Sequence, residues 1–274
     1  LRLSAKACGY RGKLSISLAA AVELVHSATL VHDDLLDDAP LRRGTETVNR
    51  RWGARTALLV ADHLYLRALS LINDLAPGRD GLDERIARVA TETAGRVFEG
   101  EVAQLFQAGN HVPSEDEYVR MIDNKTASFF SACCRIGALL GNSSEDIENT
   151  LGNYGRNLGL AFQITDDILD FVADESKLGK SVGSDVLNGI LTLPVIHLLR
   201  VAPRKERKAL LSRGETVLLE HVVRLMERYG SLDYARGKAV SFVCQAKDDL
   251  DGLPGSGAKD SLRDICDFVV ERDR

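Results

Sequence analysis

Apolar residues recur every three or four positions along almost the whole chain, whereas strict alternation of apolar and polar residues is rare. The segment with Leu218, Val222, Leu225, Met226 and Tyr229 shows this spacing clearly. Such a period places apolar side chains on one face of an α-helix. Amphipathic helices are therefore predicted at roughly residues 13–38, 47–75, 82–108, 115–140, 144–173, 191–202, 215–229, 231–252 and 258–272.

No linker of low complexity separates these helices, so the pattern predicts an all-α fold, a helical bundle in a single domain that spans residues 1–274. The longest irregular stretch, at about residues 174–189, contains Lys177, Gly179, Lys180, Gly183 and Asp185. Long loops in compact domains are often lids or binding loops. A binding role is therefore expected for this loop.

The amino-acid composition excludes few classes of protein. The chain has 274 residues, of which 45% are hydrophobic and 27% charged, which is enough to bury a large core. The net charge of -5 argues against a general nucleic-acid binder. The five cysteines lack metal-ligand spacing, and their odd number favours reduced thiols in a cytoplasmic protein without disulfides.

The sequence also bears on membrane insertion and on the start of the chain. No run of about 18 apolar residues is free of charge, so no membrane span is predicted. The opening residues lack the order of a signal peptide. Because the chain begins with Leu1 in mid-pattern, we expect that an N-terminal segment is missing from it.

Two acidic clusters form the most informative polar pattern, each with carboxylates at positions i, i+1 and i+4 of an apolar helical stretch. They consist of Asp33, Asp34 and Asp37, and of Asp166, Asp167 and Asp170. Two like charges 4 Å apart repel by about 4 kcal/mol at an effective dielectric constant near 20, which raises a pKa or recruits a metal ion. Oxygen ligands alone favour Mg²⁺, which is commonly shared with the phosphates of a substrate.

Basic and polar residues accompany both clusters. Arg42 and Arg43 follow the first cluster in a turn, and arginine presents a rigid fork of donors that matches phosphate oxygens. Lys125 and Thr126 lie in the helix predicted at 115–140, and Gln163 lies one turn before the second cluster. The alternative is structural: the two arginines could neutralise surface aspartates, and a lone lysine is usually solvated.

The order of the motifs is more specific than any one of them. The first cluster with Arg42-Arg43-Gly44 is followed by Gly100-Glu101-x-x-Gln104, Lys125-Thr126, Phe162-Gln163-x-x-Asp166-Asp167 and Gly179-Lys180-x-x-Gly183-x-Asp185. In this order the chain resembles the trans-isoprenyl diphosphate synthases, also called polyprenyl synthetases, over essentially its whole length. The resemblance implies the helical bundle of the isoprenoid synthase type with a central apolar cavity.

The resemblance also implies an activity, namely head-to-tail condensation of isopentenyl diphosphate with an allylic diphosphate. About three Mg²⁺ ions would be held by the six aspartates against the allylic diphosphate, and Lys125 and Lys180 would help catalysis by stabilising the leaving group. The residues implied to bind substrate are Arg42, Lys125, Thr126, Gln163 and Lys180 for the allylic diphosphate, and Arg43 and His26 for isopentenyl diphosphate. A homodimer whose lipidic product partitions to a membrane is expected.

The chain departs from the family pattern in two ways. A separate observation, at Ala28, concerns the length of the product. The upstream basic motif of the family would fall before Leu1, and Ile190 stands where the family frequently has a lysine. Ala28, five residues before Asp33, is small enough to leave the cavity open. It predicts a product of C30 or longer, with a C15 or C20 synthase as the alternative.

Three other interpretations compete. A terpene cyclase shares the fold, but its second metal motif usually mixes Asn, Ser or Thr with Glu. An all-helical phosphohydrolase with a His-Asp metal dyad would use His32-Asp33 and His26, with a transition metal. A non-catalytic partner subunit would have lost metal ligands, whereas both clusters are intact here.

Overall fold

Helices form nearly all of the regular structure in the computed structural model, which describes residues 1–73, 81–107, 112–172, 183, 186, 189–211 and 219–272. The first half contains α1 (Arg2–Ala7), α2 (Leu14–Leu36), a hairpin of β1 (Leu41–Arg42) and β2 (Thr45–Glu46), α3 (Val48–Trp52), α4 (Ala54–Asn73), α5 (Leu82–Gln107), α6 (Glu115–Ile122), the π-helix η1 (Asp123–Ala127) and α7 (Ser128–Leu140). The second half contains α8 (Glu145–Val172), α11 (Leu193–Val201), α12 (Arg204–Leu211), α13 (Leu219–Arg228), α14 (Ser231–Asp249), the 3₁₀-helix η2 (Leu250–Gly252) and α15 (Gly257–Glu271).

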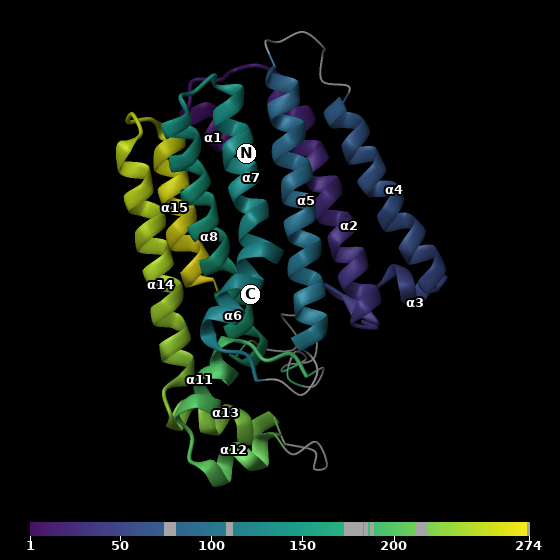
Figure 1. Cartoon of the computed structure of the whole chain (residues 1–274), viewed down its shortest axis with the longest axis vertical. Helices are drawn as coiled ribbons and strands as arrows, with labels where there is room; N and C mark the ends of the chain where they lie inside the picture. The colour runs from purple at the N-terminus through teal and green to yellow at the C-terminus, as the bar shows by residue number, and fades with distance from the viewer. Residues whose placement is uncertain are drawn as a thin grey trace.

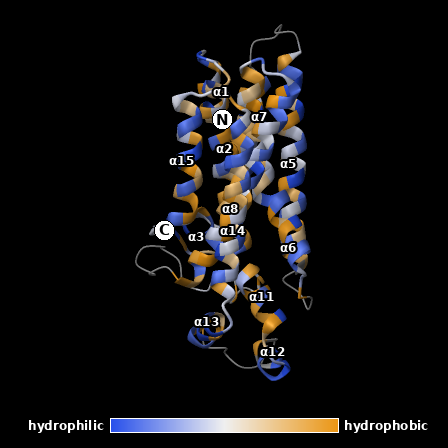
Figure 2. Cartoon of the chain, turned by 90° about the vertical axis from the view of Figure 1, so that its left-hand side faces the viewer, coloured by the Kyte–Doolittle hydropathy of each residue, from blue (hydrophilic) through white to orange (hydrophobic). Residues whose placement is uncertain are grey.

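The long helices run side by side along the long axis of the molecule, and α11, α12 and α13 form a smaller group at its lower end (Figure 1). Helix α8 packs against α7, α14 and α15, and α2 packs along α4. Both α2 and α8 end at the lower end of the long bundle, so the two acidic clusters lie at the same end of the molecule (Figure 1). Hydrophobic and hydrophilic segments share single helices such as α5, as amphipathic helices require (Figure 2).

Three groups of buried side chains make up the core. One joins α6, α8, α11, α13 and α14 around Tyr118, Ile164 and Met226. A second joins α7, α8, α14 and α15 around Tyr154, and a third joins α1, α2, α4, α5 and α7 around Leu18. Because α7 and α8 each belong to two groups, burial of apolar surface fixes these helices firmly. The second acidic cluster lies on α8, so its position is fixed by this packing.

The structure corrects several predicted boundaries. The helix predicted at 47–75 breaks into α3 and α4 at Gly53, whose φ of 84° lies in the left-handed region that glycine tolerates. The helix predicted at 115–140 is interrupted by the π-helix η1. Helices α1 and α12 and the β1–β2 hairpin were not predicted, because they are too short to show a period.

Helix α2 bears on the prediction that the chain does not span a membrane. Its length of 23 residues and its mean hydropathy of 1.6 would suffice for a span by length and composition alone. However, α2 packs along α4, and its last turns carry Asp33 and Asp34. An apolar helix that packs within a bundle meets the same criteria, so this helix is weak support for a span.

Candidate active site

The first acidic cluster lies at the end of α2 and is paired with the hairpin that follows it. Asp34 is buried, and its Oδ1 accepts a hydrogen bond of 2.7 Å from Nε of Arg42 on β1. Arg42 is held in register by its pairing with Thr45 on β2. An arginine of the turn therefore reaches the first cluster through Asp34.

Arg43 has a different environment. It lies in the hairpin turn with a φ of 50°, next to Gly44 with a φ of 77°, and its side chain is exposed. Two consecutive residues in the left-handed region give the tight two-residue turn typical of a hairpin. The turn presents Arg43 to solvent, where a substrate could reach it.

The π-helix η1 places Lys125 against the first cluster. Its Nζ lies 2.8 Å from Oε2 of Glu101, 3.1 Å from Oε1 of Gln104 and 4.0 Å from Oδ1 of Asp33. Burial alone would lower the pKa of Lys125, but the negative charges of Asp33, Glu101 and Asp37 outweigh burial and raise it above its usual value. Lys125 therefore stays charged at neutral pH.

The next residue of η1 connects to the second cluster. Oγ1 of Thr126 donates to Oε1 of Gln163 at 2.7 Å, and Nε2 of Gln163 donates to Oδ1 of Asp167 at 2.9 Å. The other carboxylate oxygen of Asp167 accepts from the hydroxyl of Tyr118 at 2.6 Å. Consecutive residues of one π-helix thus connect to the two clusters, Lys125 directly to Asp33 and Thr126 to Asp167 through Gln163. Turns of π-helix are frequent at functional sites.

Glycines allow η1 to lie this close to its neighbours. A methyl group at Gly100 of α5 would lie 2.4 Å from the backbone nitrogen of Lys125, and one at Gly159 of α8 would lie 2.6 Å from Cα of Ala127. Gly155 likewise meets the backbone carbonyl oxygen of Phe130 on α7 at 2.6 Å. Close packing of α8 against η1 and α7 therefore accounts for glycine at positions 155 and 159.

A further arginine contacts the second cluster and was missed by the sequence reasoning. Nη2 of Arg272, just after α15, donates to Oδ1 of Asp166 at 2.5 Å and to the carbonyl oxygen of Phe162 at 2.8 Å. Its guanidinium carbon lies 4.0 Å from the centroid of the Phe162 ring. No local signal predicts this contact, because 106 residues separate its partners.

The carboxylates fit a hard divalent cation by their chemistry, but they are not gathered around one point. Among the described residues, no three His, Cys, Asp or Glu side chains are placed to hold a metal ion together. Asp34 and Asp166 contact arginines, and Asp167 contacts Gln163 and Tyr118. Protein cations and donors therefore partly satisfy oxygens that suit Mg²⁺.

The contacts above do not include His26 and Ala28, which lie on α2. His26 is half-buried, and its carbonyl oxygen accepts a hydrogen bond from the hydroxyl of Thr29. Ala28 is fully buried on α2. Lys180, Gly179 and Asp185 lie outside the described residues.

His32 belongs to an aromatic group beside the first cluster. Its ring centroid lies 6.4 Å from that of Tyr65 and 6.3 Å from that of Phe98, and its Nε2 lies 3.7 Å from Oδ1 of Asp62. The buried Tyr65 hydroxyl has no hydrogen-bond partner among the described residues, and burial together with Asp33 raises its pKa to about 12. The structure thus supports packing beside the aspartates as the role of His32.

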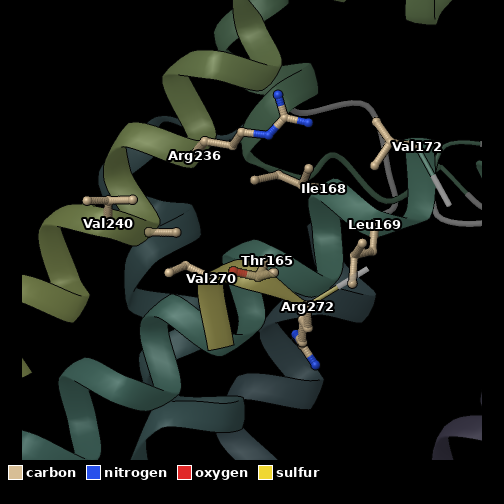
Figure 3. Close-up of a pocket in the computed structure, with 9 residues that line it drawn as sticks. Thr165, Ile168, Leu169, Val172, Arg236, Val240, Val270 and Arg272 are labelled. Carbon is tan, nitrogen blue, oxygen red and sulfur yellow. The ribbon is translucent and has the colours of Figure 1, made fainter. Parts of the chain in front are cut away.

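A pocket of about 330 Å³ lies beside the last turns of α8, the helix that carries the second cluster (Figure 3). Ile168, Leu169 and Val172 of α8 line it together with residues of α14 and α15, and Arg272 stands at its edge. It occupies the side of α8 turned toward α14, as Figure 3 shows, and so differs from the predicted central apolar cavity. The central cavity stays a prediction.

Comparisons with known proteins give a consistent result. A family model described as "Polyprenyl synthetase" matches residues 1–224. The chain is 37% identical over 274 residues to a short chain isoprenyl diphosphate synthase of Methanothermobacter thermautotrophicus, with 99% of this chain and 84% of the relative covered. It is 35% identical over 276 residues to the octaprenyl diphosphate synthase of Escherichia coli, with the same coverage.

A solved structure shows the same fold. The polyprenyl synthase of Caulobacter crescentus, whose crystal structure is complexed with calcium and isoprenyl diphosphate, superimposes with a TM-score of 0.89 at 32% identity. The match covers 99% of this chain and 83% of that one. The predicted all-helical fold of the isoprenoid synthase type is therefore confirmed.

Proposed function

The chain belongs to the polyprenyl synthetase family, whose members are trans-prenyltransferases, and from this membership we propose that it makes a polyprenyl diphosphate of C30 or longer. It does so by joining isopentenyl diphosphate to an allylic diphosphate, head to tail. Residues 1–274 act as one catalytic domain. The observation that carries the site assignment is that Lys125 lies 4.0 Å from Asp33 of the first cluster, while the adjacent Thr126 is linked to Asp167 of the second cluster through Gln163.

The proposed roles follow from the chemistry of each group. Breaking the allylic carbon–oxygen bond leaves a carbocation and a highly charged diphosphate, so catalysis needs positive charge fixed around the leaving group. About three Mg²⁺ ions, bound through Asp33, Asp34, Asp37, Asp166, Asp167 and Asp170, would neutralise that charge. The groups proposed to bind the allylic diphosphate are Arg42, Lys125, Thr126, Gln163 and Lys180, and those for isopentenyl diphosphate are Arg43 and His26.

The described contacts suit this assignment electrostatically. Lys125 is half-buried yet charged, which makes it a strong donor to a phosphate oxygen in a partly desolvated site. Oγ1 of Thr126 now donates to Gln163, and it can turn toward a bound anion. We infer that Arg42 and Arg272 release Asp34 and Asp166 when metal and diphosphate enter.

Product length is the finer part of the proposal. The two relatives above carry names of a short-chain and of an octaprenyl synthase at 37% and 35% identity, so similarity favours neither length. The small, fully buried Ala28 on α2 supports the longer product, since a bulky residue there would close the cavity below the first cluster. Val25 and Ala21 continue down the same helix.

The test is a product assay with purified protein, isopentenyl diphosphate and farnesyl diphosphate, with products sized by chromatography after dephosphorylation. The expected product has C30 or more, and Ala28→Phe shortens it. An enzyme that halts at C15 or C20 contradicts the length but keeps the reaction. Absence of any condensation by the wild type with Mg²⁺ contradicts the activity itself.

The rival functions make different predictions. A phosphohydrolase would hydrolyse nucleotides without isopentenyl diphosphate, and it would need His32 as a ligand, whereas His32 packs against Tyr65 and Phe98. A partner subunit without activity would have lost metal ligands, whereas both clusters are intact. A terpene cyclase would release a cyclic hydrocarbon, which the same chromatography detects.

A homodimer is also part of the proposal. Helix α4 exposes Leu58, Leu59, Leu66 and Leu69, and α5 exposes apolar residues at helical spacing. Contiguous exposed apolar surface of this kind marks a protein interface. We propose that two copies pair through α4 and α5 in the cytoplasm, and that the lipidic product passes to a membrane.

A further inference from the structure

The corner of the molecule formed by residues 41–56, which we name the α3 corner, has a charge opposite to that of the whole chain. It contains Arg42, Arg43, Arg50, Arg51 and Arg55. With Glu46 as its single acidic residue, the α3 corner carries a net charge of +4, so the remainder carries -9 against a total of -5. A local basic patch of this size directs the protein toward anionic partners.

The α3 corner also exposes its largest apolar side chains. Trp52, the only tryptophan of the chain, is 58% exposed, and Leu41 is 44% exposed. The guanidinium carbon of Arg51 lies 4.8 Å from the centroid of the Trp52 ring. Tryptophan beside arginine is typical of surfaces that meet the boundary between lipid headgroups and acyl chains.

This exposure belongs to a well-held structure and not to a frayed end. Thr47 is buried, accepts from the backbone nitrogen of Arg50 at 3.4 Å and donates to the carbonyl oxygen of Ala39 at 2.6 Å. Nδ2 of Asn49 donates to the same carbonyl oxygen at 3.3 Å. Helix α3 also contacts α2 and α4, so the α3 corner is fixed to the bundle.

The arginines of α3 and of the start of α4 have no acidic partner. Within the part of the chain that the structure describes, Arg50, Arg51 and Arg55 are exposed and take part in no ion pair. An exposed arginine without an acidic partner can approach an anionic lipid without first breaking an ion pair. Arg42, by contrast, forms an ion pair with Asp34.

We propose that the α3 corner docks the protein on the surface of an anionic lipid bilayer. Arg50, Arg51 and Arg55 contact lipid phosphates, and Trp52 and Leu41 enter the headgroup region. Figure 1 places α3 at the end of the bundle where α2 ends, so a bilayer there lies close to the first acidic cluster. Delivery of a lipid product to the bilayer, as a use of this contact, rests on the proposed function. The contact with lipid itself does not depend on that function.

Because Trp52 is the only tryptophan, its fluorescence reports directly on the α3 corner. The wild-type protein is titrated with vesicles of phosphatidylcholine containing about one third phosphatidylglycerol, and separately with pure phosphatidylcholine vesicles. We expect a blue shift of the emission with the anionic vesicles only, reversed by high salt because screening weakens the attraction. Sedimentation with the vesicles gives the bound fraction independently.

The test variant is Arg50→Gln/Arg51→Gln/Arg55→Gln, for which we expect vesicle binding at least about tenfold weaker. The matched control is Arg204→Gln/Lys205→Gln/Lys208→Gln, which removes three exposed cations from α12 and leaves the α3 corner intact. The control should bind like the wild type. Turnover of the test variant in buffer without vesicles should also match the wild type, since none of its residues is assigned to the site.

Four results would overturn the proposal: no shift with anionic vesicles, equal loss in the control, an equal shift with heparin, or a shift that follows protein concentration alone. The last would mean that a second copy covers Trp52. The fluorescence assay uses no substrate. Failure of the proposed reaction therefore leaves its outcome unchanged, and the two failures are distinguishable.

Discussion

Several charged side chains of the site have a neighbour of opposite sign in the described part of the chain. Lys125 lies among Glu101, Gln104 and Asp33, and Arg42 is bonded to Asp34. A buried charge without a partner would cost several kcal/mol, so these contacts keep the protein stable before substrate binds. They also hold the groups in place for an anion.

Thr126→Val tests the connection between the clusters at the level of one atom. The change removes the donor to Gln163 but keeps the shape of the side chain. We expect a loss of stability of about 1 kcal/mol and an increase of roughly tenfold in KM for the allylic substrate. Steady-state kinetics and urea unfolding measure the two effects, and an unchanged KM would contradict the role of Thr126.

The sequence revealed part of this residue-level detail. Both clusters, Lys125, Thr126 and Gln163 were found because their types and spacing carry a chemical meaning. Arg272 and Tyr118 were missed because their contacts with Asp166 and Asp167 arise from packing of distant helices. The contact of Arg42 with Asp34 was not specified by the sequence either, because it depends on the way the hairpin turns the side chain.

Among the elements, the π-helix η1 depends on a close approach to α5. Gly100 permits this approach, and a methyl group there would lie 2.4 Å from the backbone nitrogen of Lys125. A side chain in such a position forces the backbone to move, which typically costs about 1–3 kcal/mol. The movement would also displace Lys125.

Gly100→Ala should therefore lower both the free energy of unfolding and the affinity for the allylic diphosphate. Gly95→Ala on the same helix is the matched control, because nothing lies within 4 Å of a methyl group there. The control should be stabilised by up to about 1 kcal/mol through helix propensity. Equal behaviour of the two variants in unfolding and binding assays would contradict the account of η1.

Helix α11 offers a test by pH. His197 is buried, its Nδ1 lies 3.0 Å from Oγ of Ser231, and burial together with Arg200 lowers its pKa against the opposing effect of Glu115. A lowered pKa in the folded state means that unfolding takes up a proton. Stability should then be fully present above the ordinary histidine value of 6.5 and fall as the pH drops through the lower folded-state value.

His197→Gln should flatten this dependence, as measured by urea unfolding between about pH 7 and 5. The control is His221→Gln, whose side chain on α13 is exposed. If His197→Gln loses stability with acid as steeply as the wild type, burial of this histidine is not the cause.

The long helices could be predicted because the 3.6-residue period is strong over many turns, as in α8, which was predicted at 144–173 and spans Glu145–Val172. The short elements could not be predicted from the sequence. A π-helix differs from an α-helix by one residue in its turn, and neither the period nor the residue types of 123–127 indicate it. The break at Gly53 has a local signal, a glycine, that was not used.

In a single copy of the protein, α4 and α5 expose large apolar side chains to solvent. Leu59 and Leu66 of α4 are 68% and 64% exposed, and Phe98, Val102 and Leu105 of α5 are exposed at steps of four and three. Isolated exposed leucines are common, but a stripe over two adjacent helices is not. This surface is the basis for the expected homodimer.

Leu66→Glu should convert a dimer into monomers, because it places a charge in the apolar stripe. Light scattering coupled to gel filtration measures the mass. Phe268→Glu on α15 is the control, since Phe268 is equally exposed at 67% but lies away from α4 and α5. A wild-type monomer, or a Leu66→Glu dimer, would contradict the assignment of this interface.

Fold class and family were predictable because the motifs recur in a fixed order along a helical chain. Product length was not, since it depends on the depth of a cavity that packing of several helices creates. Ala28 is buried on α2, but its position in the sequence does not say which residues of other helices would face it.

The central claim is that the two acidic clusters bind divalent ions together around one diphosphate. Calorimetry of a non-reactive farnesyl thiodiphosphate, with and without Mg²⁺, tests it most directly on the wild type, Asp33→Asn and Asp166→Asn. We predict that removing Mg²⁺ or changing either cluster weakens binding at least about tenfold, a loss of about 1.4 kcal/mol. Binding that needs no metal, or that survives intact in either variant, would contradict the claim.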